Sequence, residues 1–331
     1  MSTAPPRIDI QQEGYKEKAR EAFIRHGSVI LSGVVPMNGQ EWSDRAADIP
    51  SLLWGPSELL LKNHTVAGVH LEHSALKLVG KSLSPHTDGY VWGDGYCDIV
   101  ILYCEAPSDD GGENFLIDGE ELVAALNADT RKILSESLID HTERKEYGSF
   151  TDGAESIVPV LRWKQSGGNN SNDDTDESMN VTASWYPGKR MCMRRMIDYG
   201  FTSGEKDDTD QYMSLWRPTG EDTNERMRVQ QALEDFDRLI KSQSETAARF
   251  RLGRGETLLV DNFRMFHARD AYSAAEGSTE RRLWRVWAWT NDSFGLPPEV
   301  DHENIAATPV EARADIEAST APSTEATAVS G

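Results

Sequence analysis

Two histidines and one aspartate, far apart in the sequence, are the residues of this chain best suited to chemistry. His86 and Asp88 flank Thr87, and His267 follows far downstream. Side chains at positions i and i+2 of an extended strand point the same way, so His86 and Asp88 can reach one ion. Two imidazoles and a carboxylate on one face of a metal leave the opposite positions open. That is the ligand set expected of a non-haem Fe(II) oxygenase.

Arginines follow the second histidine. Arg281 and Arg285 lie four residues apart in RRLWRVWAWT (residues 281–290), a segment rich in Trp and Val that alternates like a strand. A period of two places Arg281 and Arg285 on one face of that strand and Arg282 on the other. A guanidinium offers a fixed cationic fork for a carboxylate, so this pair predicts an acidic cosubstrate. Because the chain carries a net charge of −21, an anion needs such a local cationic pocket.

Four motifs, in this order, make the chain resemble the TauD/TfdA-type Fe(II)/2-oxoglutarate-dependent dioxygenases, close to their clavaminate-synthase-like branch. They are HTD at 86–88, GGE at 111–113, GETLLVDNFRMFHAR at 255–269 and the distal RRLWRVW at 281–287. The similarity covers roughly residues 19–292. It implies a mostly β fold with helical additions, built on a double-stranded β-helix (jelly-roll, cupin-like) core.

The resemblance also implies which residues hold the metal. His86, Asp88 and His267 match the iron ligands of the family. Related halogenases have Gly or Ala at the position of Asp88, which opens a metal position for chloride. A carboxylate at Asp88 fills that position, so we expect oxygenation rather than halogenation.

Three residues are implied for the cosubstrate. Arg281 matches the arginine that grips a carboxylate of 2-oxoglutarate, and Arg285 matches a second arginine near the cosubstrate or substrate. A slip of one residue would give the first role to Arg282. The family often has Thr two residues after the glycine pair, whereas this chain has Asn114, whose amide can still donate a hydrogen bond.

Two further segments are candidates for the substrate pocket. Tyr90 and Trp92 follow the HTD motif directly and offer flat apolar surface near the metal. The alternative is an ordinary loop that packs its aromatic residues inward. Arg195 ends a basic island at residues 189–195, which would close over a carboxylate or phosphate of the substrate. Its alternative is charge balance against the flanking acidic loops.

These observations predict an oxygenase that uses Fe(II), 2-oxoglutarate and O2 to hydroxylate an unactivated C–H bond, with release of succinate and CO2. The substrate expected by family analogy is a small polar metabolite, such as an amino acid or a specialised-metabolite intermediate. Desaturation, epimerisation or oxidative rearrangement with the same cofactors is the first alternative. A non-catalytic β-barrel that senses a metal or ligand is the second.

Composition sets the surroundings of this chemistry. The 331 residues suffice for one catalytic domain with extensions. Three cysteines without a paired motif predict free thiols in a reducing cytoplasm. The negative charge argues against a nucleic-acid partner. The sequence contains no run of about 18 apolar residues, so no membrane span is expected. The oligomeric state stays open.

The chain is expected to form a catalytic domain over residues 1–296, with a polar insertion near residues 165–179 and a flexible acidic tail at 297–331. Periodicity predicts helices at 12–25, 119–128, 129–139 and 225–243, and the last has Met227, Leu233, Phe236 and Ile240 spaced for one face. It also predicts strands at 28–32, 98–104 and 113–117, the last as a neighbour of the one before it. Two further strands are expected around the turn pair Asp261-Asn262.

Overall fold

The structure is a computed structural model, and it describes residues 3–33, 60–70, 82–89, 95–141, 157–165, 189–195, 217–273, 281–290 and 293–294. Most of the predicted insertion and the whole predicted tail lie outside these residues. No helix in the described part of the chain is both long enough and apolar enough to cross a membrane.

Six strands form the larger sheet, in the order β1-β2-β13-β5-β16-β3. Their bounds are β1 Arg7–Asp9, β2 Ser28–Ser32, β13 Thr257–Asp261, β5 Ile99–Ala106, β16 Arg282–Thr290 and β3 Leu60–His70. All neighbours are antiparallel except β1 and β2, which are parallel. The expected strands at 28–32, 98–104 and 281–290 are confirmed to within a few residues.

The sheet that carries most of the candidate site is smaller, with the order β4-β14-β7. Its strands are β4 Leu83–His86, β14 Met265–Arg269 and β7 Asn114–Asp118, paired antiparallel. The prediction that the strand at 113–117 neighbours the one at 98–104 is wrong, because β5 lies between β13 and β16 in the other sheet. Between β5 and β7, Gly111 and Gly112 take φ values of 69° and 73° and redirect the chain into the smaller sheet.

A shared interior lies between the two sheets. Leu258 and Val100 of the larger sheet belong to the same buried cluster as Leu116 and Met265 of the smaller one. Along β16 the alternation predicted from sequence is confirmed, since Leu283 and Trp289 belong to this cluster and Trp287 packs against it. Even-numbered residues of β16, such as Trp284 and Ala288, join a second cluster with Phe23 of the first helix.

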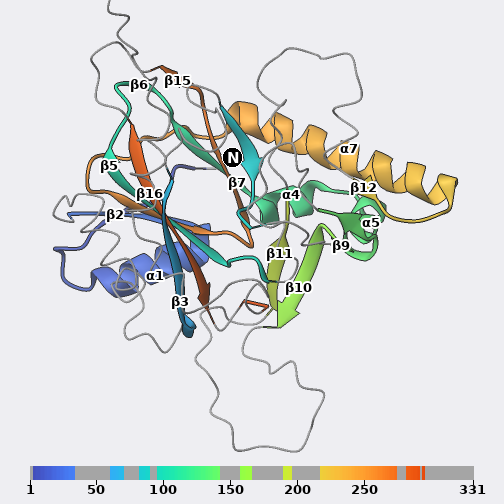
Figure 1. Cartoon of the computed structure of the whole chain (residues 1–331), viewed down its shortest axis with the longest axis horizontal. Coiled ribbons are helices and arrows are strands. Elements are labelled where there is room, and N and C mark those ends of the chain that lie inside the picture. Colours follow the sequence, from blue (N-terminus) through green and yellow to red (C-terminus); the bar gives the residue numbers. More distant parts are fainter. Residues whose placement is uncertain are drawn as a thin grey trace, which may run out of the picture.

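Helices cover the outer faces of the sheets (Figure 1). The helix α1 (Tyr15–His26) packs on the larger sheet through Ala19 and Phe23. The smaller sheet is covered by α4 (Gly119–Ala125), α5 (Ala128–Glu136) and α7 (Thr223–Thr246). These four helices agree with the predicted ones.

The long helix α7 buries Leu233, Phe236 and Ile240 completely, as its sequence pattern predicts. Met227, which was expected on the same face, is 58 % exposed. It lies in the first turns of α7, beyond the part of the helix that packs on the smaller sheet, so the prediction for Met227 is wrong.

Short strands complete the described fold. They are the hairpin of β10 (Leu161–Gln165) with β11 (Lys189–Met193), the set β12 (Arg217–Pro218), β8 (Ile139–Asp140) and β9 (Ile157–Val158), and the pair β6 (Asp110–Gly111) with β15 (Tyr272–Ser273). The sheet content, the two facing sheets and the shared interior agree with the expected mostly β fold.

Candidate metal centre

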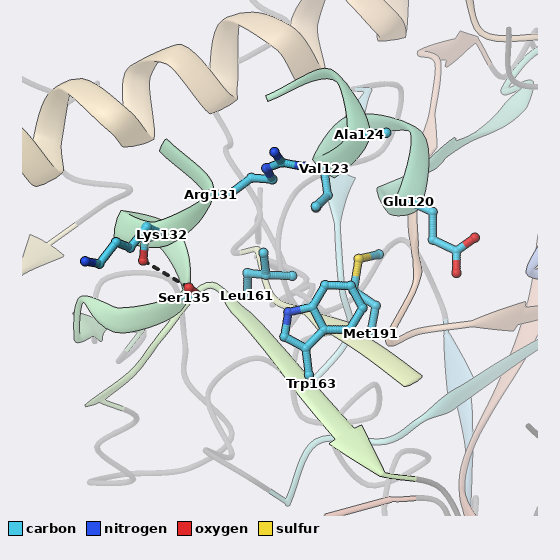
Figure 2. A pocket seen from close by; sticks show the side chains of 9 residues that line it. All are labelled: Glu120, Val123, Ala124, Arg131, Lys132, Ser135, Leu161, Trp163 and Met191. Atoms are coloured by element: carbon cyan, nitrogen blue, oxygen red, sulfur yellow. Dashed lines mark hydrogen bonds between the residues drawn. The ribbon is translucent and has the colours of Figure 1, made fainter. Parts of the chain in front are cut away.

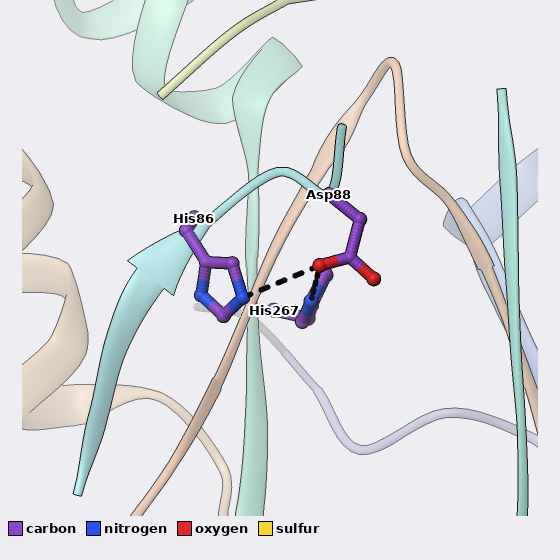
Figure 3. A group of neighbouring side chains, drawn as sticks. All are labelled: His86, Asp88 and His267. Carbon is purple, nitrogen blue, oxygen red and sulfur yellow. Dashed lines mark ion pairs between the residues drawn. The ribbon is translucent and has the colours of Figure 1, made fainter. Parts of the chain in front are cut away.

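Neighbouring strands of the smaller sheet bring the two histidines together. His86 ends β4, and its register partner on β14 is His267. Their ring centroids lie 4.2 Å apart. Asp88 lies two residues after His86, in the turn that follows β4. Its carboxylate points back toward both rings (Figure 3). The structure therefore brings together all three residues that the sequence nominated as metal ligands.

The ligand atoms have the geometry of a facial metal site. The Nε2 atoms of His86 and His267 each lie 3.6 Å from the same oxygen of Asp88, Oδ1. Within the described residues, this is the cluster of His, Cys, Asp and Glu side chains whose ligand atoms lie within 4.8 Å of one another. Ligands about 2.1 Å from a common metal at right angles are about 3 Å apart, so a small inward shift suffices. Two nitrogens and one oxygen on one side suit Fe(II).

Hydrogen bonds already set the orientation of His86. Its Nδ1 lies 2.7 Å from the carbonyl oxygen of Ser84, so Nδ1 carries the proton and Nε2 is left as the ligand atom. The Nδ1 atom of His267 is buried and has no hydrogen-bond partner in the described part of the chain. Its Nε2, the other ring nitrogen, faces Oδ1 of Asp88 at 3.6 Å.

Burial and charge keep the ligands in the protonation states that a metal needs. Burial, together with the neighbouring His267, lowers the pKa of His86 to about 4, so the ring is neutral near pH 7. Burial alone would raise the pKa of Asp88, but Arg285 and the two histidines hold it well below its usual range. A neutral imidazole beside a carboxylate anion is the state that binds a divalent cation.

Two side chains from β16 hold the carboxylate of Asp88. The Nη1 atom of Arg285 donates to both of its oxygens, at 3.3 Å and 3.1 Å. The indole Nε1 of Trp287 donates to Oδ2 at 2.7 Å. Oδ2 therefore accepts from two donors, while Oδ1 accepts the longer bond from Arg285 and faces the histidines. Sequence reasoning missed Trp287, although its position two residues after Arg285 places it on the same face of the strand.

Asn262 holds the backbone of Asp88. Its side-chain oxygen accepts a hydrogen bond from the Asp88 amide at 2.9 Å, and its Nδ2 donates to the Asp88 carbonyl at 2.9 Å. The same Nδ2 donates to the carbonyl of Cys97 at 2.7 Å. Asn262 was predicted only as a turn residue. The available signal in the sequence was the position of Asn262 in the DNF motif, shortly before His267. A side-chain amide that is buried at such a turn is expected to have hydrogen-bond partners.

The predicted cosubstrate residues Arg281 and Asn114 lie together. Arg281 is buried, and its Nη2 lies 3.5 Å from Oδ1 of Asn114, a long hydrogen bond. Gly112 lies beside Arg281 and is closely surrounded, because a Cβ at that position would lie 2.9 Å from Oγ of Ser108 and 3.2 Å from Cβ of Tyr272. Arg282, the alternative to Arg281, instead pairs with Glu105 at 2.8 Å and is 40 % exposed.

The structure does not place Arg195 as a group open to a substrate. Its side chain is completely buried, donates to Asp237 of α7 at 3.2 Å, and also donates to the carbonyl of Pro85. Its backbone amide donates to the hydroxyl of Thr87 at 3.1 Å. Arg195 therefore supports the strand that carries His86, which replaces the expected contact with substrate. The sequence does not reveal this role, because the partner Asp237 lies far from Arg195 along the chain.

Tyr90 and Trp92, the other predicted pocket residues, lie outside the described residues. An open pocket of about 410 Å³ lies between the helices α4 and α5 and the β10–β11 hairpin (Figure 2). Its lining includes none of the three metal ligands. The lining residues are Glu120, Val123, Ala124, Arg131, Lys132, Ser135, Leu161, Trp163 and Met191.

Comparisons with known proteins identify the family of this chain. Residues 5–287 match the family described as taurine catabolism dioxygenase TauD, TfdA family. None of the curated proteins matches the chain.

Solved structures with the same fold include the non-haem iron oxygenase OrfP with Fe, succinate and (3S)-hydroxy-L-Arg. It is 15 % identical, with a TM-score of 0.52, and the match covers 85 % of this chain and 82 % of that one. OrfP with Fe and α-ketoglutaric acid is 17 % identical, with a TM-score of 0.51 and coverage of 84 % and 80 %. An asparagine oxygenase with Fe(II), 3-hydroxyasparagine and succinate is 17 % identical, with a TM-score of 0.49 and coverage of 87 % and 90 %.

The family match extends over nearly the whole chain, and the triad of His86, Asp88 and His267 has the ligand chemistry that such enzymes need. The chain therefore belongs to the TauD, TfdA family and is a 2-oxoglutarate-dependent non-haem iron dioxygenase.

Proposed function

We propose that this enzyme hydroxylates an unactivated C–H bond of a small polar metabolite, with an amino acid as the preferred class, and releases succinate and CO2. The metal assignment depends on one observation: the Nε2 atoms of both histidines lie 3.6 Å from the same oxygen of Asp88. The amino-acid class is supported by the shared fold with OrfP, whose structure contains a hydroxylated arginine. An amino-acid carboxylate also suits a site rich in arginine.

In this proposal His86, His267 and Oδ1 of Asp88 hold the iron. When bound, iron with O2 and 2-oxoglutarate supplies the oxidising power that no side chain has. The protein supplies orientation. Trp287 and Arg285 hold Oδ2 of Asp88, so Oδ1 would be the oxygen that binds a metal together with the two histidines.

Arg281 is proposed to bind the distal carboxylate of 2-oxoglutarate, with Asn114 beside it. Burial supports this role, because an arginine shielded from water binds a carboxylate more strongly than an exposed one. Arg282 pairs with Glu105 and is exposed, which supports the assignment to Arg281 rather than to its neighbour. Arg285, which contacts Asp88, is proposed to lie at the border between cosubstrate and substrate.

The test is turnover with Fe(II), 2-oxoglutarate, O2 and a panel of free L-amino acids, read as succinate formed and as product mass. We expect succinate to be coupled to a product that has gained one oxygen atom. A product that has lost two hydrogens would identify desaturation instead. No amino-acid-dependent succinate formation would overturn the substrate class.

Arg281→Met and Arg282→Met are a matched pair for the cosubstrate assignment. They remove the same group from adjacent positions of one segment. We expect the KM for 2-oxoglutarate to rise at least tenfold in Arg281→Met and to stay within about twofold in Arg282→Met. The opposite ranking would assign the cosubstrate to Arg282.

The free thiols are consistent with a cytoplasmic enzyme, a location that we include in the proposal.

A further inference from the structure

Arg190 belongs to the basic segment at residues 189–195, yet it points into the protein. It lies on β11, and its side chain is 3 % exposed. Its Nη1 donates to Oδ2 of Asp98 at 3.2 Å, and its Nη2 donates to Oδ1 of Asp261 at 2.6 Å. Both carboxylates are buried at least as deeply, with exposed fractions of 1 % and 0 %. One arginine therefore bridges two buried acids from different strands.

The two acids stand at the ends of segments that meet at the metal site. Asp261 ends β13 and precedes Asn262, while Asp98 follows Cys97 and immediately precedes β5. The amide of Asn262 donates to the carbonyl of Asp98 at 3.0 Å. Nη2 of Arg190 approaches that same carbonyl at 3.5 Å. The bridge thus fixes the distance between the backbone at Asp98 and the backbone at Asp261, the residue before Asn262.

Each acid is also tied to its own surroundings. Oδ1 of Asp261 accepts the backbone amides of Phe263 at 3.0 Å and Arg264 at 3.3 Å, which shapes the turn between β13 and β14. Oδ1 of Asp98 accepts the amide of Thr290, at the end of β16, at 2.9 Å. Arg190 therefore links β11 to the ends of the three strands β5, β13 and β16 at one point.

Asn262 passes this arrangement on to the metal site. Its carboxamide holds both the amide and the carbonyl of Asp88, and it also donates to the carbonyl of Cys97, the residue before Asp98. A displacement of Asn262 relative to Cys97 breaks at least one of these three bonds. Asp88 has no place in a regular strand, so its backbone depends on them.

We propose that Arg190 is a positioning residue for the metal centre: by bridging Asp98 and Asp261 it holds Asn262 in the place from which Asn262 fixes Asp88. The inference rests on the proposed function only in taking Asp88 as a metal ligand. The energetics of a buried ionic bridge are consistent with a positioning role rather than with a role in stability. Burying an arginine and two carboxylates is weak support for stability, since apolar side chains of similar volume often do as well, whereas a directional bridge fixes one geometry.

The test compares Arg190→Lys with Leu233→Ala. Lysine keeps the charge but offers one point of contact in place of a fork, so it cannot hold both acids in the same geometry. Leu233 is completely buried in α7 on the outer face of the smaller sheet, and its truncation lowers stability without touching the bridge. Amide hydrogen exchange of Asp88 in the metal-free protein is the first readout, and anaerobic Fe(II) affinity is the second.

We expect Arg190→Lys to raise the exchange rate of the Asp88 amide and the Kd for Fe(II) at least tenfold. Leu233→Ala should leave both within about twofold at a comparable loss in unfolding midpoint. Should Arg190→Lys not fold, Asp98→Asn weakens the same bridge from the other side and is expected to give the same two changes. Lower stability with unchanged exchange and unchanged Fe(II) affinity would overturn the proposal.

These outcomes separate the positioning role from the proposed function. If the wild type binds Fe(II) but forms no succinate, the proposed function fails, while the exchange of the Asp88 amide still decides the role of Arg190. If Asn262→Ala leaves that exchange rate unchanged, the link from Arg190 to Asp88 is refuted even when turnover is normal.

Discussion

Replacing Trp287 by Phe tests whether the orientation of Asp88 is fixed before a metal arrives. The change removes one hydrogen bond, from the indole Nε1 to Oδ2 of Asp88 at 2.7 Å, and keeps an aromatic ring in place. A hydrogen bond to a charged acceptor contributes about 1.5–3 kcal/mol. Arg285 still donates to the same oxygen at 3.1 Å, so we expect the lower end of that range.

A loss of about 1.5 kcal/mol in metal binding corresponds to a roughly tenfold rise in the Kd for Fe(II). The reason is that Trp287 leaves only Oδ1 of Asp88 directed at the two histidines. Without it Oδ2 keeps only the bond from Arg285, and removing such outer partners typically costs about 10–100-fold in affinity. The assay is an anaerobic Fe(II) titration of the purified protein, with urea unfolding of the metal-free form measured in parallel.

Trp284→Phe is the matched control. Trp284 lies on the same strand, and its Nε1 donates to Oε2 of Glu105 at 2.6 Å, but it points to the opposite face. The control therefore loses the same kind of bond away from the metal. We expect its Fe(II) affinity to equal that of the wild type. An unchanged Kd in Trp287→Phe, or an equal rise in both variants, would refute the reasoning.

Three further perturbations have defined outcomes. Gly112→Ala puts a methyl group 2.9 Å from Oγ of Ser108 and 3.2 Å from Cβ of Tyr272, at a φ of +73°. We therefore expect urea unfolding to show a loss of about 1–2 kcal/mol and the KM for 2-oxoglutarate to rise; unchanged values would contradict the described packing. Burial and His267 lower the pKa of His86 to about 4, whereas the unfolded chain takes up that proton near pH 6.5. Because the unfolded state binds the proton first as the pH falls, the free energy of unfolding of the metal-free protein should decrease by up to about 3 kcal/mol between roughly pH 6.5 and 4. His86→Gln should reduce this decrease, and a flat profile in the wild type would contradict the prediction. Burial raises the pKa of both Cys104 and Cys192 to about 12, so a thiol reagent at pH 8 should label native protein slowly and denatured protein fully; rapid native labelling would count against the described burial.

The sequence predicts the parts of this site that depend on local spacing. The HTD motif places His86 and Asp88 on one side of an extended segment, and the alternation in β16 separates Arg281 from Arg282. The strand at 28–32 and the helix α7 follow from their own patterns of apolar residues. These features need only nearby residues, so one sequence suffices for them.

Features that depend on distant partners were missed. Asn262 and Trp287 act on Asp88 across a long separation in sequence, so nearby residues do not identify Asp88 as their partner. Arg195 was misread because its partner, Asp237, lies in α7. The place of β7 was mistaken because the glycine pair sends the chain into the other sheet, and pairing between sheets is a tertiary property.

The most direct test of the central claim is an anaerobic absorbance titration of the wild-type protein with Fe(II) and then with 2-oxoglutarate. The account predicts a visible metal-to-ligand charge-transfer band that forms only when both are present, is lost in His267→Ala, and is weakened or shifted in Asp88→Ala. Absence of the band in folded wild-type protein, or an unchanged band in His267→Ala, would contradict the assignment of His86, Asp88 and His267 as the iron site.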